Sequence, residues 1–371
     1  MNGISVIITF YNGISSLEQC VSIVKTSLKN EKKQEILIVN DNPKIHLESI
    51  AEKYGARLIN MPRNMGYAGA CNRSVPTAHY DTLLFMDCDI YPSGYWFEHM
   101  KNTYHDIDEK GCVSASIYET DTGNLFGYGM AVHEIDILLF LRHGIPTQFS
   151  QKDRDFPIVS SGCMMMSKAL YLELGGQDEL CMNIHCDVDL AFRVLKKGYR
   201  IRMCAKAKVF HRGQISGPIR TIPFRQDVKA YLFKKWGSEL GSIWDVKKIF
   251  HEVWSSFDIG LLRGKNVIAL SFSNSLYRYD YIKMLEEYFN LNVLQIHDVK
   301  NIKGESHIIL QEAVGWDICR FNVPILYFSD DYRLISNNYY WFINRAGTPD
   351  LIADKNGNLM YSPNYHLKFN N

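Results

Sequence analysis

The chain has little that would mark a nucleic-acid-binding or a disulfide-stabilised protein. Its 41 lysine and arginine residues are balanced by 40 acidic residues, so the net charge of +1 gives no general attraction for nucleic acid. Its nine cysteines include no CxxC pair and are odd in number. Scattered thiols of this kind favour a reducing compartment over a disulfide framework or a zinc site.

Signals for export or membrane insertion are also lacking. The first residues, MNGISVIITFYNG, have neither the basic segment nor the cleavage site of a signal peptide, and they are typical of a first strand. The apolar stretch IDILLFL at 135–141 is far shorter than the about 20 residues that a spanning helix needs. We therefore predict a soluble cytoplasmic protein and leave open a peripheral contact with the inner face of the membrane.

What the sequence does have is apolar residues, at 46%, and a strand–helix alternation over its first 90 positions. The apolar runs VIITF, EILIVND, ARLINM and TLLFMDCD are expected as strands, and SSLEQCVSIVKTSLK, HLESIAEKYG and MGYAGACNRSVPTA as the helices between them. Such alternation predicts right-handed crossovers and an α/β fold with a mostly parallel, doubly wound sheet.

Polar clusters follow each of these strands, at 9–12, 40–42, 62–64 and 87–89. Ligands of such sheets bind beyond the carboxyl ends of the strands, so we expect the four clusters on one rim. Asp87 and Asp89 are like charges two positions apart, and oxygen ligands of this kind favour Mg²⁺ or Mn²⁺ together with phosphate oxygens. Taken alone, the same pair is also compatible with a simple turn cap.

The length of 371 residues predicts more than one domain. We expect a first domain at 1–235, a helical connector rich in aromatic and basic residues at 236–264, and a smaller Rossmann-like α/β module at 265–371. Acceptor recognition, partner docking or homo-oligomerisation are the roles that we expect of this C-terminal module.

A family resemblance follows from motifs that occur in order along the first 235 residues. The chain resembles family 2 glycosyltransferases of the GT-A fold, most of all the rhamnosyl- and galactosyltransferase-like members of bacterial surface polysaccharide assembly. The motifs are VIITFYNG, LIVNDN, PRNMGYAGACN, FMDCDIYP, SSGCMMMSK and DVDLAFRVLKKGYR, followed by VFHRG.

The resemblance implies a set of donor-binding residues for a nucleotide-diphosphate sugar. The loop after the first strand would embrace the nucleotide, Asp41 would read the base, and the N-x-G loop would pack beside nucleotide and sugar. The implied set is Thr9, Tyr11, Asn12, Asp41, Arg63, Asn64, Gly66, Asn72 and Asp87.

The same resemblance implies a metal site and a catalytic base. Asp89 and His211 would be the metal ligands. The family places its base in an E-D pair that opens the D-L-x-x-R helix, which makes Asp187 the base here and leaves Cys186 in the place of the glutamate. The implied acceptor-binding residues are Ser161, Gly162, His185 and Asp189.

The expected function is that of an inverting, metal-dependent glycosyltransferase acting on a glycan or lipid-linked glycan acceptor, with Mn²⁺ or Mg²⁺ as cofactor and no nucleic-acid partner. A catalytically weak nucleotide-sugar-binding or scaffolding subunit is the alternative, suggested by Cys186 and the C-terminal module. A nucleotidyltransferase is a further alternative, but TFYNGISS lacks the basic residue expected after its first strand.

Overall fold

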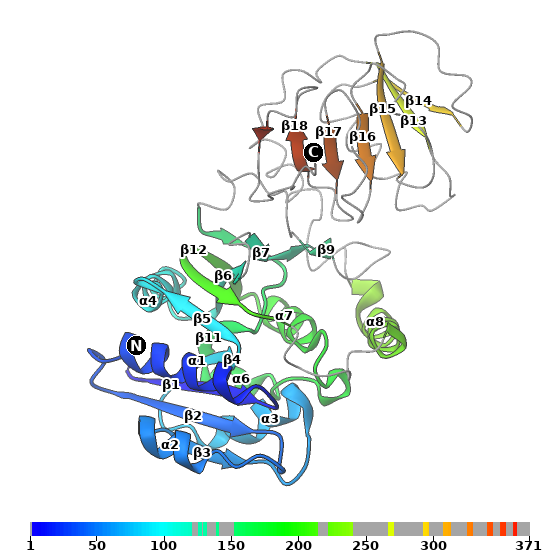
Figure 1. Ribbon diagram of the computed structural model, residues 1–371. Helices are drawn as coiled ribbons and strands as arrows, with labels where there is room; N and C mark the ends of the chain where they lie inside the picture. Colours follow the sequence, from blue (N-terminus) through cyan, green and yellow to red (C-terminus); the bar gives the residue numbers. More distant parts are fainter. Residues whose placement is uncertain are drawn as a thin grey trace. The chain divides into compact units, whose positions relative to one another are not determined.

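The computed structural model describes residues 2–120, 125–127, 129–131, 139–140, 152–213 and 222–239, together with the strands β13 to β19 between 266 and 361. The chain divides into two compact units (Figure 1). The first comprises Met1–Leu138 and Gln151–Trp244, and the second comprises Leu139–Ser150 and Asp245–Asn371. The boundaries at 235 and 264 stay predictions, since most of the expected connector lies outside the described residues.

One half of the main sheet is parallel, as expected. It consists of β3 (Arg57–Asn60), β2 (Gln34–Asn40), β1 (Ile4–Phe10) and β4 (Thr82–Asp87) in that order. β1, β2 and β4 are almost wholly buried because both sheet faces are covered, which is why they appear in the sequence as continuous apolar runs.

The other half makes the sheet mixed, which corrects the expectation of a mostly parallel one. β11 (Cys163–Ser167) runs antiparallel to β4 on one side and to β6 (Gly111–Glu119) on the other. Beyond β6 lie β12 (Arg200–His211) and β10 (Arg154–Asp155), while β5 (Ile90–Ser93) pairs with β12 and β7 (Leu125–Gly127) pairs with β6. The buried run of β11 carries no signal of direction, so its antiparallel placement was not visible in the sequence.

Helices cover both faces of this sheet. α1 (Ile14–Ser27) and α4 (Trp96–His105) share one core with alternate residues of β1, such as Val6 and Ile8. On the opposite face, α6 (Lys168–Glu173) packs Tyr171 against Phe85 of β4, with ring centroids 5.1 Å apart. The remaining elements of this unit are α2 (Glu48–Tyr54), α3 (Gly66–Ser74), η1 (Val75–Thr77), β8 (Met130–Ala131), η2 (Glu179–Cys181), α7 (Cys186–Lys196), α8 (Ile222–Trp236) and η3 (Gly237–Glu239).

Gly111 begins β6 in a conformation that only glycine adopts readily. Its φ is +104°, and a Cβ there would lie 1.9 Å from the Arg200 carbonyl oxygen of the neighbouring β12. We expect Gly111→Ala to lower the free energy of unfolding by at least about 2 kcal/mol, measured by urea denaturation. Gly94→Ala is the control, because Gly94 also has positive φ but no atom near the added Cβ. Equal losses in the two variants would contradict the steric argument.

The second unit contains a seven-stranded sheet. Its strands are β13 (Asn266–Leu270), β14 (Asn292–Ile296), β15 (His307–Glu312), β16 (Ile325–Phe328), β17 (Tyr340–Ile343), β18 (Pro349–Ala353) and β19 (Leu359–Tyr361). In the order β14-β13-β15-β16-β17 all neighbours are parallel, and β18 and β19 continue antiparallel. The expected helices of this module fall outside the described residues, so its Rossmann-like character stays a prediction. β9 (Leu139–Phe140) also belongs to this unit.

Within the described parts of both units, no helix combines the length and the apolar character needed to cross a bilayer.

Candidate active site

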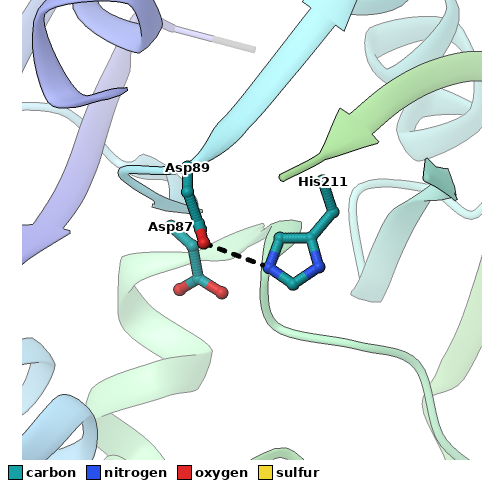
Figure 2. Close-up of side chains that lie close together, drawn as sticks. All are labelled: Asp87, Asp89 and His211. Atoms are coloured by element: carbon teal, nitrogen blue, oxygen red, sulfur yellow. Dashed lines mark ion pairs between the residues drawn. The ribbon is translucent and has the colours of Figure 1, made fainter. Parts of the chain in front are cut away.

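Three potential metal ligands meet at the carboxyl edge of the main sheet. Asp87 ends β4, Asp89 lies in the turn that follows, and His211 ends β12 (Figure 2). β12 pairs with β5 so that His211 stands opposite Ile90, and this pairing places its imidazole Nε2 3.3 Å from Oδ2 of Asp89. One ligand atom from each of the three residues lies within 4.8 Å of the others. Two carboxylates and one imidazole at this spacing can serve as ligands of a divalent cation.

Gly162 lies directly against Asp87. The Asp87 amide donates a 3.0 Å hydrogen bond to the Gly162 carbonyl oxygen, and a Cβ on Gly162 would lie 3.2 Å from Oδ2 of Asp87. A side chain at 162 would therefore press on the carboxylate. The segment at 160–163, expected to line the acceptor site, is thus in contact with the acidic pair.

Asp41 is buried at the end of β2 and holds the loop that leads into α3. Its Oδ1 accepts a hydrogen bond of 2.6 Å from the Met65 amide, and its Oδ2 accepts one of 2.9 Å from the Gly66 amide. Burial raises the pKa of Asp41 to about 6, against the lowering effect of these two hydrogen bonds. Asn64 supports the same turn, since its Oδ1 also accepts from the Gly66 amide at 3.0 Å.

Asp187 lies in the first turn of α7, near enough to Asp87 for the two charges to interact. Its Oδ1 accepts from the Val188 amide at 3.0 Å. Burial of the carboxyl group raises its pKa to about 6; hydrogen bonds from the backbone amides of Ser161 and Val188 lower it, and the charge of Asp87 raises it further. A carboxylate with this pKa is ionised at neutral pH and is a stronger base than an exposed aspartate.

Residues 5–175 match the sequence model described as glycosyl transferase family 2. This part of the chain is similar in sequence to glycosyltransferase family 2. Uncharacterized glycosyltransferases of Rickettsia typhi (strain ATCC VR-144 / Wilmington) and Rickettsia prowazekii (strain Madrid E) are 28% and 27% identical to the chain over 205 residues, which are 52% of this chain and 58% of each relative. The chain thus spans little more than half the length of these curated relatives.

A solved structure has the fold of the main unit. The crystal structure of GalNAc-T7 with UDP, GalNAc and Mn2+ superimposes with a TM-score of 0.52 at 16% sequence identity, covering 69% of this chain and 55% of that one. Together with the family match, this likeness identifies the main unit as a GT-A fold with a mixed sheet.

Cys186, which the resemblance aligns with a glutamate, is turned into the core of the domain. It is buried at 4% exposure, and burial raises the pKa of its thiol far above the usual value. A neutral, enclosed thiol can neither act as a base at neutral pH nor reach a substrate. His185, which precedes it, adopts a left-handed conformation with φ of +59° and is half-buried at the start of α7.

Asp189 has a structural role in place of the expected acceptor contact. Its carboxylate is fully buried, with Oδ2 paired to Arg193 at 2.7 Å and Oδ1 accepting from Trp236 at 2.8 Å and Lys235 at 2.7 Å. Oδ1 thus faces α8, and Oδ2 faces Arg193 one turn further along α7. The structure therefore corrects the sequence-based expectation for this residue.

Asn72 is also engaged away from the predicted donor site. Its Oδ1 accepts from the Tyr171 hydroxyl at 2.7 Å and the Gln177 amide at 2.8 Å. Its Nδ2 donates to the Gln177 carbonyl at 2.9 Å and to Glu179 at 3.2 Å. These four hydrogen bonds use the full capacity of the amide, so a donor contact of Asn72 finds no support here.

The remaining donor-side residues lie on the same rim as the acidic pair. Thr9 is opposite Asp87 in the β1–β4 ladder, and the Tyr11 carbonyl accepts a 3.0 Å hydrogen bond from Asn42. Asn12 and Arg63 are exposed. The rim thus offers polar groups from three loops, as the sequence analysis expected.

Two residues of the site were not identified from the sequence. The Tyr67 hydroxyl donates to the Ser161 carbonyl at 3.1 Å, and the Tyr67 amide donates to Oδ1 of Asn183 at 2.6 Å. Tyr67 lies inside the motif MGYAG and could have been found there. Asn183 stands in a stretch without any recognisable pattern.

Proposed function

We propose that the chain is an inverting, metal-dependent glycosyltransferase that moves a sugar from a nucleoside-diphosphate donor to a glycan or lipid-linked glycan. The observation that carries the proposal is the convergence of Asp87, Asp89 and His211 at the rim, with Asp187 close enough for the charge of Asp87 to raise its pKa. Asp87, Asp89 and His211 suit a metal ion and a diphosphate, and Asp187 suits removal of a proton from the acceptor hydroxyl.

The two carboxylates and the imidazole of this cluster suit Mn²⁺ or Mg²⁺ as ligands. Asp89 and His211 would hold the ion, with Asp87 beside them. GalNAc-T7, whose solved structure contains UDP and Mn2+, supports Mn²⁺ and a uridine nucleotide as the first ligands to test. When bound, such an ion offsets the negative charge of the diphosphate leaving group.

The chain's own residues account for the proton transfer. Asp187 accepts the proton of the acceptor hydroxyl as that oxygen forms a bond to the anomeric carbon. The bond from the anomeric carbon to the β-phosphate oxygen breaks at the same time, and the nucleoside diphosphate leaves with the bonding electrons. Attack opposite the leaving group inverts the anomeric centre.

The wider setting is part of the same proposal. We infer a hexosyl donor, a place in the assembly of a surface polysaccharide, and a cytoplasmic location with peripheral membrane contact. We assign the C-terminal module to acceptor recognition or to homo-oligomer formation. Because Cys186 is buried, it does not distinguish a transferase from a scaffolding subunit, and only a turnover assay does. Nucleotide binding without transfer of any sugar would favour the scaffolding subunit.

Thermal shift with a panel of UDP-, GDP- and dTDP-sugars, with and without Mn²⁺, tests the donor site. At a ligand concentration of 100 times Kd, binding stabilises the folded state by about 2.7 kcal/mol. We expect one nucleotide class to raise Tm only when Mn²⁺ is present, and Asp89→Ala to abolish this increment. Asp106→Ala, at an exposed position after α4, should retain it. A full increment in Asp89→Ala would contradict the metal assignment.

A further inference from the structure

The first four N–H groups of α3 are all engaged by other parts of the chain, although they are the groups that a helix cannot satisfy internally. Met65 and Gly66 donate to Asp41, Tyr67 donates to Oδ1 of Asn183, and Ala68 donates to the Met182 carbonyl at 2.9 Å. These four N–H groups are therefore not free to bind an anion. The start of α3 instead links Met182 and Asn183, which precede α7, to the loop that Asp41 holds.

The backbone around Asn183 is held in an unusual shape by these contacts. Met182 has φ of 48° and ψ of −93°, and His185 has φ of 59°. Residues other than glycine seldom adopt such conformations unless their surroundings impose them. Gly66 permits the close approach, since a Cβ there would lie 3.3 Å from Oδ1 of Asn183 and from backbone atoms of Met182.

Tyr67 extends the connection to the proposed base. Its amide is held by Asn183, and its hydroxyl donates to the Ser161 carbonyl at 3.1 Å. The backbone N–H of Ser161 in turn lies close enough to the carboxylate of Asp187 to lower its pKa. Hydrogen bonds therefore connect Asp41, through the start of α3 and Tyr67, to the backbone of Ser161, which adjoins Asp187.

We propose that Asn183 and Tyr67 are positioning residues that fix the catalytic base relative to the donor loop. Asn183 caps α3 and sets the place of Tyr67, and Tyr67 sets the place of Ser161 and hence of Asp187. The inference rests on the proposed transferase function for its catalytic consequence. Its structural part, the coupling of residues 65–68 to residues 160–162, stands independently of that function.

Hydrogen–deuterium exchange of the full chain tests the coupling without any substrate. We expect Asn183→Ala to increase amide exchange both in peptides covering 65–68 and in peptides covering 160–162. Ser167→Ala is the matched control: it also removes a helix cap, the 3.1 Å bond to the Leu170 amide, at the opposite end of the sheet ladder. It should leave both regions unchanged. Faster exchange confined to 65–68 in Asn183→Ala would overturn the coupling.

Release of nucleoside diphosphate from the sugar nucleotide selected by thermal shift tests the catalytic consequence. We expect Tyr67→Phe and Asn183→Ala to lower kcat by roughly 10- to 100-fold, because small misplacements of reacting groups cost about this much. Tyr67→Phe should leave the donor Kd unchanged.

Rescue by a conservative replacement separates positioning from general destabilisation. Asn183→Asp keeps an acceptor oxygen for the Tyr67 amide, and a negative charge is favourable at a helix N-terminus. It should restore most of the kcat that Asn183→Ala loses. Equal kcat losses in Asn183→Ala, Asn183→Asp and Ser167→Ala would overturn the positioning role. Absence of wild-type turnover with every sugar nucleotide would overturn the proposed function, and with it only the catalytic part of this inference.

Discussion

Asp187→Asn should lower the kcat of sugar transfer by about 10²- to 10⁴-fold, the usual contribution of a general base. Asparagine is close in size and keeps the oxygen that accepts from the Val188 amide at 3.0 Å, but it cannot take the proton of an acceptor hydroxyl. The donor Kd, measured by titration with the sugar nucleotide and Mn²⁺, should stay within a few-fold of wild type. Asp81→Asn, an exposed change before β4, is the control for the substitution itself.

The pH dependence of kcat also tests the assignment of Asp187 as the base. Because the pKa of Asp187 is raised to about 6 and the base must be ionised, kcat should fall as the pH drops through about 6. The pKa of Asp41 is raised to about 6 as well, and its protonation would act on donor binding. Measurement at saturating donor therefore isolates Asp187. Near-normal turnover of Asp187→Asn, with the inflection near pH 6 still present, would show that another group is the base.

The parallel half of the fold could be predicted because its signals are local. Each strand of β1, β2 and β4 is a buried apolar run followed by polar residues, and a helix pattern lies between successive strands. The mixed half could not be predicted in the same way. β11 is the apolar run CMMMS, and nothing in that run shows that it lies antiparallel between β4 and β6.

The residues at the rim were predictable for the same reason. Carboxyl ends of parallel strands meet at one edge, so Asp41 and Asp87 had to lie on the same side of the sheet. His211 required the family resemblance, because its position depends on β12 pairing with β5 far away in the sequence.

The two corrected residues show where such reasoning stops. Asp189 stands in a motif with Asp187, two positions away, and the sequence does not reveal that its side chain points toward α8. Asn72 lies in α3, the helix that follows the N-x-G loop, yet its partners Tyr171 and Gln177 lie about 100 positions further on. In both cases the deciding contact is long-range, and no local pattern encodes it.

The buried carboxylate of Asp189 leads to the largest expected loss of stability. It accepts from Trp236 and Lys235 of α8 and pairs with Arg193, which also donates to the Leu174 carbonyl. Removing one partner of a buried charged network costs about 3–5 kcal/mol. Here Arg193 and the buried Trp236 N–H would lose their partner, whereas Lys235 would keep its ion pair with Asp178. We expect Asp189→Ala to lose about this much in urea denaturation.

An exposed ion pair gives the matched comparison. Glu173 pairs with Lys197 at 2.6 Å, and both side chains are about half exposed, so Glu173→Ala should cost no more than about 1 kcal/mol. An acceptor-binding role for Asp189 predicts a different result: an unchanged free energy of unfolding and a raised KM for the acceptor. The network predicts the reverse, because this carboxylate joins α7 to α8. Loss of the Asp189 carboxylate should therefore first loosen the packing of α8. The start of α7, where Asp187 lies, should loosen as a consequence.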